Sequence, residues 1–320
     1  MRILKNNEIK ILEWLVSLSQ EELRKSMATY LKKYYSNIII TNDYIVAEGN
    51  IPIALAAHMD TVFADGERDV FYDPKHSVVW SPDGLGADDR AGIFAIISII
   101  KDGFRPHIIL TTDEESGCLG AEKLSKLPMP FKELKYIIEL DRRGINDCVF
   151  YDCYNEKFIE YIESFGFVEN WGTFSDISTI CPAWDACGVN LSIGYFNEHS
   201  HVETLHIGYM FNTIEKVKKM LAVPTAEIPN FKYVRVAHSY LHYLDKMQNF
   251  IKEGVICACC GNFFDEYDTY PVMTKDGEKP YCITCLSDEK IEWCSVCGEP
   301  FIPNMEQTRC DHCVGGKKVV

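Results

Sequence analysis

The sequence predicts an α/β fold with a mostly parallel, mixed sheet and helices on both faces, followed by a small cysteine-rich zinc-binding domain. Strand-like apolar runs alternate with helical patterns through the first domain, and polar residues recur where those runs end. Nine of the fourteen cysteines lie between Cys257 and Cys313, which indicates metal binding rather than disulfides. We therefore divide the chain into a first domain (1–223), a linker with a helix (224–253) and a cysteine-rich domain (254–320).

Each element of the first domain follows from the spacing of its apolar residues. We expect helices at about 7–18, 20–35, 88–100, 155–166 and 206–223. A hairpin is predicted at 37–50, because Asn42-Asp43 lies between two β-rich runs. Further strands are expected at 51–62, 77–80, 135–144, 147–153 and 187–200, and a strand, polar loop and helix within 107–127. Two prolines at 224–230 indicate a linker, and a helical stretch follows at about 232–252.

Composition excludes several classes of function. The formal net charge of −15 argues against general affinity for nucleic acid or an anionic membrane. The N-terminal residues have the spacing of an amphipathic helix interrupted by charges, not that of a signal peptide. The longest apolar run, around Ile93–Ile100, is too short to span a bilayer. We therefore expect a soluble, cytoplasmic protein with no membrane or nucleic-acid partner.

Acidic residues and histidines cluster where predicted strands end. The clusters are His58 and Asp60; Asp88 and Asp89; Asp113, Glu114 and Glu115; Glu139 and Asp141; and Glu198, His199, His201 and Glu203. The carboxyl ends of strands in such sheets meet at one edge, so these groups should converge. A mixed set of imidazoles and carboxylates suits zinc, or cobalt and manganese. The set is large enough for two metals, a shared carboxylate and a base for the bridging water.

Two nucleotide-binding interpretations fail on their own requirements. The run "HIILTTDEE" resembles a Walker-B strand, but the chain contains no G-x-x-x-x-G-K-[ST] segment to accompany it. The run "GLGADDRAG" imitates a dinucleotide-binding loop, but Asp89 occupies the position of the third glycine. We therefore interpret both segments as parts of a metal site.

The ordered set resembles the co-catalytic di-zinc exopeptidases, which include zinc aminopeptidases and the related carboxypeptidases and deacylases. It runs His-x-Asp, Gly-x-x-Asp-Asp-x-x-Gly, Glu-Glu, Asp and His, over about residues 50–220. The resemblance implies two catalytic zinc ions, or cobalt or manganese. The roles it implies are His58 and Asp141 on the first metal, Glu115 and His199 on the second, Asp88 bridging both, Glu114 as general base, and Asp60 orienting His58.

Some assignments within this resemblance stay open. Asp89 competes with Asp88 for the bridge, and we favour Asp88 because it follows "GLGA". His201 competes with His199, which we favour because "HSHVE" resembles the family's His-Ser/Thr-x-x-Glu ending. Asp113 has no implied role, and we expect it to cap the loop or helix that follows.

The implied activity is hydrolysis of amide bonds in peptides or small amides. Only 57 residues separate Asp141 from His199, which leaves little room for an inserted lid domain and favours an aminopeptidase-like core. Arg142 and Arg143 either hold a substrate carboxylate or pair with surface acids. One alternative is an N-acyl amino acid deacylase or carboxypeptidase-type amidohydrolase. The other is a non-catalytic scaffold that binds partners through its tail.

The cysteine-rich tail contains enough thiolates for two closed zinc sites. The C-x-x-C pairs are Cys257/Cys260, Cys282/Cys285, Cys294/Cys297 and Cys310/Cys313. Eight thiolates make two Cys₄ sites, and "CACCG" and "CSVCG" resemble zinc-ribbon knuckles. Sequential pairing puts the first two pairs on one zinc, whereas a cross-braced arrangement puts the first pair with the third. Cys259 is an alternative ligand to Cys257.

Metal should supply the stability of this tail, because a segment of about 60 residues buries little core. The tail carries more acids than bases, which disfavours phosphate binding. We therefore expect a protein partner, substrate recognition or oligomer contacts, or else a stabilising appendage. The two structural zincs add to the two catalytic metal ions.

Overall fold

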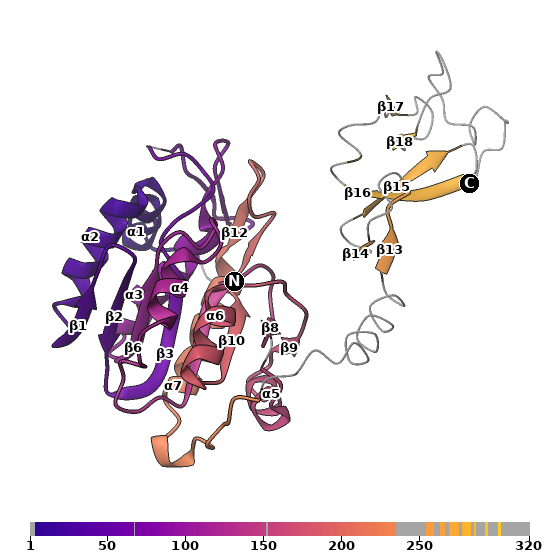
Figure 1. Cartoon of the computed structure of the whole chain (residues 1–320). Helices are drawn as coiled ribbons and strands as arrows, with labels where there is room; N and C mark the ends of the chain where they lie inside the picture. Colours follow the sequence, from indigo (N-terminus) through magenta and orange to yellow (C-terminus); the bar gives the residue numbers. More distant parts are fainter. Residues whose placement is uncertain are drawn as a thin grey trace. The chain divides into compact units, whose positions relative to one another are not determined.

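The computed structural model describes residues 4–66, 68–151 and 153–234, and short segments of the tail: 254–258, 263–265, 269–274, 277–282, 285, 292–293 and 300–301. The chain divides into two compact units, Met1–Val236 and Ala237–Val320 (Figure 1). The first unit contains all of the residues predicted for the dinuclear site.

An eight-stranded sheet forms the centre of the first unit, in the order β1-β2-β6-β3-β7-β10-β8-β9. Its strands are β1 (Asn37–Ile40), β2 (Tyr44–Glu48), β3 (Ile51–His58), β6 (Pro106–Thr111), β7 (Tyr136–Arg142), β8 (Asp147–Val149), β9 (Val168–Glu169) and β10 (Gly188–Ser192). β6, β3, β7 and β10 run parallel, and antiparallel pairs flank them. The central strands are apolar and buried on both faces, as parallel strands require.

Helices cover both faces of this sheet (Figure 1). They are α1 (Asn6–Ser17), α2 (Gln20–Leu31), α3 (Ala87–Lys101), α4 (Leu119–Ser125), α5 (Glu156–Glu163), α6 (Asp176–Trp184) and α7 (Ile207–Leu221). α4 packs against α6 on one face, whereas α3 contacts α1 and α7 on the other. α3 is apolar and buried along almost its whole length because helices cover it from outside. The predicted fold class is confirmed.

A second, four-stranded sheet stands at one end of the unit and differs from the expectation. Its order is β11-β12-β5-β4, from β4 (Phe71–Asp73), β5 (Val78–Trp80), β11 (Tyr195–Phe196) and β12 (Thr204–His206). The strand predicted over 187–200 therefore breaks after Ser192, and Gly194, with a φ of 93°, lies between its two parts. α6 was not predicted, because its Pro182 and short length hide the helical period.

The core of the first unit extends beyond residue 223. After α7, a 3₁₀ turn at Thr225–Glu227 leads to Ile228 and Tyr233, which are buried in the same apolar cluster as the sheet. Ile228, which lies in the segment 224–230 predicted as a linker, therefore packs on the core of the first unit. The helix predicted over 232–252 lies almost wholly outside the described residues. No helix in the described part of the chain is long and apolar enough to cross a bilayer.

The described strands of the second unit are short, and all of their pairings except the parallel contact between β15 and β18 are antiparallel. β13 (Gly254–Ile256) pairs with β14 (Phe263–Asp265), and β15 (Thr269–Thr274) pairs with β16 (Gly277–Cys282). β17 (Glu292–Trp293) and β18 (Pro300–Phe301) complete the second sheet.

Gly92 of α3 approaches β7 too closely to carry a side chain. A Cβ there would lie 2.5 Å from the Leu140 backbone oxygen and from both Asp89 carboxylate oxygens. Gly92→Ala should therefore lower the free energy of unfolding by about 2 kcal/mol, because α3 must shift from the sheet. Thermal denaturation measures this. Gly208→Ala in α7, where a Cβ meets nothing within 4 Å, is the matched control and should not lower Tm. Equal losses in both variants would contradict the close packing.

Candidate metal centre

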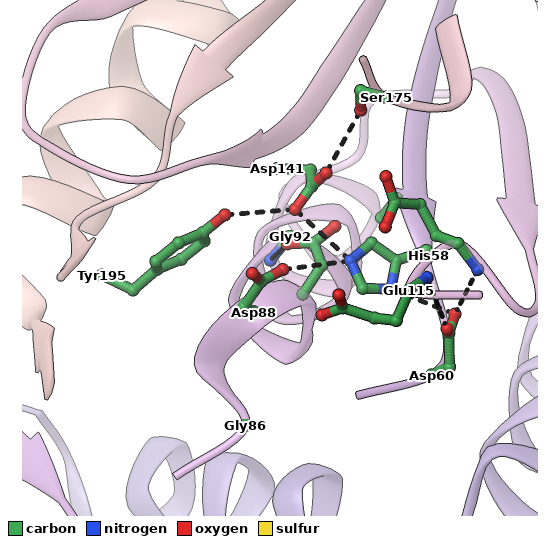
Figure 2. A network of polar contacts seen from close by, with 12 residues as sticks. His58, Asp60, Gly86, Asp88, Gly92, Glu115, Asp141, Ser175 and Tyr195 are labelled. Atoms are coloured by element: carbon green, nitrogen blue, oxygen red, sulfur yellow. Dashed lines mark hydrogen bonds and ion pairs between the residues drawn. The ribbon is translucent and has the colours of Figure 1, made fainter. Parts of the chain in front are cut away.

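Asp88 faces His58 with one carboxylate oxygen and His199 with the other, at the carboxyl edge of the sheet, and Figure 2 shows the contact with His58. Its Oδ1 is 3.0 Å from His58 Nε2, which is also 3.4 Å from Asp141 Oδ1. Its Oδ2 is 3.1 Å from His199 Nε2, which is also 3.0 Å from Glu115 Oε2. The side chains thus form two groups of potential metal ligands, and one carboxylate belongs to both.

The position of Asp88 is set by the glycine-rich loop before α3. Gly86 has a φ of 70°, in the left-handed region that glycine enters without strain. The buried carboxylate of Glu203 accepts hydrogen bonds from the backbone N–H groups of Gly86, at 2.5 Å, and Asp88, at 3.1 Å. The peptide bond between Asp88 and Asp89 is cis. Glu203, which follows His199 in the sequence, thereby fixes the loop that carries Asp88.

Asp60 joins the first histidine to the acidic turn after β6. Its Oδ1 accepts from His58 Nδ1, at 3.2 Å, and from the backbone N–H of Glu114, at 3.0 Å. Its Oδ2 accepts the backbone N–H of Glu115 at 2.9 Å. Because His58 Nδ1 is used here, the opposite ring nitrogen, Nε2, faces Asp88. The predicted orienting contact between Asp60 and His58 is present, and the two backbone contacts are additional.

Asp141 is held by residues that the sequence did not single out. The Tyr195 hydroxyl donates to its Oδ1 at 3.2 Å, and Ser175 Oγ lies 3.2 Å from its Oδ2 (Figure 2). The Ser175 hydroxyl donates to Glu139 Oε2, 2.6 Å away, and has Asp141 Oδ2 as a second acceptor. Burial raises the pKa of Glu139 well above its usual value. Asn190 bonds both the N–H and the carbonyl of Asp141.

The donor set fits metal ions by type and by distance. Tetrahedral zinc with nitrogen and oxygen ligands at about 2.0–2.2 Å places its ligand atoms roughly 3.3–3.6 Å apart. The facing atoms described above lie 3.0–3.4 Å apart, so each group has nearly the edge length of such a polyhedron. Glu115 Oε1 is buried and makes no hydrogen bond, although a carboxylate oxygen in such a position requires a partner. These residues therefore fit two cations that share Asp88.

Protonation of the histidines shows how strongly the centre favours positive charge. Burial alone would lower the pKa of His58, but Asp141 and the other carboxylates raise it well above the usual value. Hydrogen bonds to Asp88 and Glu115 raise the pKa of His199 to about 11. Burial opposes ionisation of Asp88, but bonds from both histidines hold its pKa below the usual value. Without metal, protons therefore occupy the positions where cations would lie.

Glu114 points into the centre without joining the groups that share Asp88. One of its carboxylate oxygens lies within 4.8 Å of both a His58 ring nitrogen and a Glu115 oxygen. In the protein without cations, burial and then the Asp141 carboxylate raise the pKa of Glu114 to about 8. The Cys118 thiol lies 3.6 Å from Oε1 and can donate to it. Glu114 is thus a buried carboxyl beside the ligands, the placement that a general base requires.

The structure separates the competing residues that the sequence left open. Asp89 is fully buried, its Oδ1 accepts the Gly92 N–H at 2.9 Å, and it joins no ligand group among the described residues. His201 is exposed, its ring lies 6.0 Å from that of Phe63, and it joins no ligand group among the described residues. Asp88 and His199 are therefore the members of each pair that face the centre.

Asp113 does not cap the segment that follows, contrary to expectation. The N–H of Leu119 bonds the backbone oxygen of Asp113, at 3.1 Å, and α4 receives no side-chain cap. The Asp113 carboxylate instead accepts from Gln20 Nε2 at 3.0 Å. The φ of Asp113 is 55°, a conformation that aspartate tolerates better than most residues. Its role is to turn the chain rather than to cap a helix.

The two arginines after Asp141 pair with acids. Arg142 Nη2 lies 3.7 Å from Asp147 Oδ2, and Arg143 Nη1 lies 3.2 Å from Glu198 Oε1. From the sequence, these arginines are expected either to hold a substrate carboxylate or to pair with surface acids. In the structure they lie beside acids. Glu198 lies next to His199, so its charge is close to the centre.

In the tail, the cysteines of the first and second pairs come together. The sulfurs of Cys257, Cys282 and Cys285 lie within 4.8 Å of one another, and all three residues are buried. The Cys282 N–H donates to Cys257 Sγ at 3.3 Å. Sequential pairing predicts this grouping for the first zinc site. Cys260 lies outside the described residues, as do the cysteines predicted for the second site, Cys294, Cys297, Cys310 and Cys313.

The pKa shifts predict that the metal-free protein loses stability as pH rises. Asp141 has a pKa of about 7, raised by burial and Asp88, and those of Glu114 and His199 are about 8 and 11. All three bind protons more tightly in the folded than in the unfolded chain, so unfolding free energy falls between pH 5 and 8. Manganese, which prefers these ligands to thiolates, should raise Tm more at pH 8 than at pH 6, because fewer protons compete.

Thermal denaturation with and without manganese measures both effects. Asp88→Asn, which weakens the shared ligand, should abolish the shift in Tm caused by manganese. A manganese shift of the same size in wild type and in Asp88→Asn would contradict binding at this centre.

Comparison with protein-family models and with curated proteins gives no match. Comparison with solved structures gives clear similarity. An aminopeptidase, PepT, from Bacillus cereus matches with a TM-score of 0.52 and 14% identity, over 68% of this chain and 98% of that one. A tripeptidase from Staphylococcus aureus gives 0.54 and 13%, over 68% and 98%. An aminopeptidase from Desulfurococcus kamchatkensis gives 0.50 and 14%, over 69% and 96%. The first unit therefore has the fold of these peptidases.

Proposed function

We propose that this chain is a dinuclear metallohydrolase that cleaves amide bonds in peptides, and that it acts as an aminopeptidase. The observation that carries the proposal is the shared carboxylate: the two oxygens of Asp88 face two different histidines, each with a further carboxylate beside it. A carboxylate between two ligand groups is the arrangement that a two-metal hydrolase requires. The burial of several carboxylates at one place carries a desolvation cost that bound cations would offset.

His58 and Asp141 would hold one divalent cation, zinc or else cobalt or manganese, and His199 and Glu115 the other, with Asp88 on both. Cations bound there supply a water of lowered pKa and polarise the scissile carbonyl. The neighbours of the ligands keep them in place. Asp60 fixes the His58 ring, and the Tyr195 hydroxyl fixes Asp141 (Figure 2).

Glu114 acts as the general base. Its carboxylate accepts a proton from the attacking water and later donates that proton to the nitrogen of the leaving amine. In the metal-free chain burial and then the Asp141 carboxylate raise its pKa, and the bound cations would lower it again. The backbone N–H of Glu114 donates a hydrogen bond to Asp60. This bond holds the main chain of Glu114 in place beside the centre.

Two observations support action at the amino end of a peptide. The solved structures with this fold include two aminopeptidases and a tripeptidase. Arg142 and Arg143 lie beside Asp147 and Glu198, which favours pairing with these acids over binding of a substrate carboxylate. A deacylase or carboxypeptidase-type amidohydrolase is the alternative that a substrate panel separates.

For the tail we propose two structural zinc sites with sequential pairing. The grouping of Cys257 with Cys282 and Cys285, and the N–H···S contact within it, support the first site. The second site, from Cys294 to Cys313, is proposed from spacing alone. A protein partner for this tail remains part of the proposal, and the surplus of acids disfavours nucleic acid.

Replacement of the base tests the catalytic proposal. Glu114→Gln should lower kcat by about 10³-fold because the proton of the attacking water loses its acceptor. Metal content should not change, because Glu114 is not assigned as a ligand. The measurement is hydrolysis of dipeptides with a free amino end, the same dipeptides acetylated, and N-acyl amino acids, together with metal analysis.

Glu122→Gln, an exposed residue of α4 that pairs with Lys126, is the matched control and should be fully active. Equal rates for wild type and Glu114→Gln would remove Glu114 as the base. Cleavage of only the acylated substrates would replace the aminopeptidase proposal with the deacylase.

Metal analysis tests the tail separately from the core. The full chain should bind about four metal ions, two held tightly by cysteine and two exchangeable. Cys282→Ser should lose about one zinc and keep peptide hydrolysis, because its site belongs to the other unit. Cys148→Ala in β8, a buried cysteine outside these ligand groups, is the control and should keep every metal ion. Unchanged zinc content in Cys282→Ser would refute the first tail site.

A further inference from the structure

The acidic turn, residues 112–118, carries both the proposed base and a proposed metal ligand. Its second residue, Asp113, has a φ of 55°, which lies in the left-handed region. On the side of the metal centre, Asp60 accepts the N–H groups of Glu114 and Glu115. A residue held in this conformation persists only where its surroundings fix it. The contacts of Asp113 therefore matter for the direction of the two glutamates.

Gln20 makes those contacts from the opposite side. Its Nε2 donates to Asp113 Oδ1 at 3.0 Å, and its Oε1 accepts the Asp113 backbone N–H at 2.9 Å. Two hydrogen bonds in opposite directions fix the orientation of Asp113 as well as its position. Gln20 is the first residue of α2, which buries Leu23 and Met27, so the contact comes from a packed helix rather than a loop.

The corner between α1 and α2 is also attached to other loops of the centre. Arg68 Nε donates to the backbone oxygen of Val16 at 3.1 Å. Arg90 Nη2 donates to that of Leu18 at 3.0 Å, and Arg90 lies two residues after Asp88 in a fully buried position. The N-terminal helices are thereby connected to the segment that carries the shared carboxylate and to the acidic turn.

We propose that Gln20 is a positioning residue for the reaction. It holds Asp113 in the left-handed conformation, so that Glu114 faces the attacking water and Glu115 faces His199. The inference rests on the proposed function. It adds to the site a residue of α2, far from Glu114 in sequence, that is placed in contact with neither metal nor substrate. The side chain must be an amide, because one of its atoms donates to the carboxylate while the other accepts from the backbone.

The pair of Gln20 and Asp113 can be tested by exchanging the amide and the carboxylate between the two positions. Gln20→Glu keeps the acceptor for the Asp113 N–H but places a second carboxylate beside Oδ1. An acid in the first turn favours a helix, so α2 should stay intact. Asp113→Asn alone still offers an oxygen to Gln20 and should be tolerated. In the double variant, the amide at position 113 donates to the carboxylate at position 20, which restores both bonds.

The expected results separate positioning from general stability. Gln20→Glu should lower kcat by about 10-fold with KM little changed, because the base is displaced while substrate binding is not. The double variant should return kcat to within about threefold of wild type. Hydrogen exchange of Thr111–Leu119 in the metal-free protein should be faster in Gln20→Glu and normal in the double variant. Glu21→Gln, an exposed neighbour in α2, should match wild type in both measurements.

Wild-type exchange and wild-type kcat in Gln20→Glu would overturn the inference. Faster exchange throughout the unit, or a loss of kcat that the double variant does not restore, would also overturn it, because either result indicates only general destabilisation. An inactive wild type would refute the proposed function. Hydrogen exchange would then still decide whether Gln20 holds the acidic turn.

Discussion

The Asp60 carboxylate is the contact on which the rest of the centre depends. It binds the His58 ring and the backbone N–H groups of Glu114 and Glu115, which come from two neighbouring strand ends. One buried group therefore sets the direction of the His58 ring and the path of the turn that carries Glu114 and Glu115. A buried carboxylate is stable only when its oxygens are bonded, and here three N–H donors satisfy it. Because β3 and β6 are parallel neighbours, the sheet brings these donors together before any metal binds.

Several carboxylates are buried close together around Asp60, which costs free energy through desolvation and mutual repulsion. Positive charge beside them offsets this cost. Asp88 is buried yet ionised, because a histidine faces each of its oxygens. Glu139 lies behind that edge, where burial raises its pKa well above the usual value, and the Ser175 hydroxyl links it to Asp141. The histidine contacts thus keep the pKa of Asp88 low, whereas burial raises the pKa values of Asp141 and Glu139. Carboxyl groups of the same centre differ in pKa because burial and neighbours differ.

The sequence predicted those parts of the fold and the site that local order encodes. His58, Asp88 and Asp141 lie at the ends of apolar runs or directly after a glycine turn, so their convergence follows from the geometry of a parallel sheet. Ser175, Tyr195 and Gln20 are common residues in distant segments, and no spacing connects them to the site. Strands of two or three residues, as in the small sheet, give no period to detect. The left-handed turn at Asp113 was equally hidden, because aspartate is ordinary in loops.

We expect the first unit to fold without metal and the second unit to need metal for folding. In the first, helices and an eight-stranded sheet bury a continuous apolar cluster that includes Ile53, Phe94 and Leu140, so the ligands stand on a scaffold that packing already specifies. In the second, the described cluster consists of Val272 and Tyr281 with three cysteines. Among the described residues of this unit, the three cysteines make up most of the buried cluster. We therefore expect metal loss to leave the first unit folded and to unfold the second, because the proposed ligands of the tail are themselves part of its buried cluster.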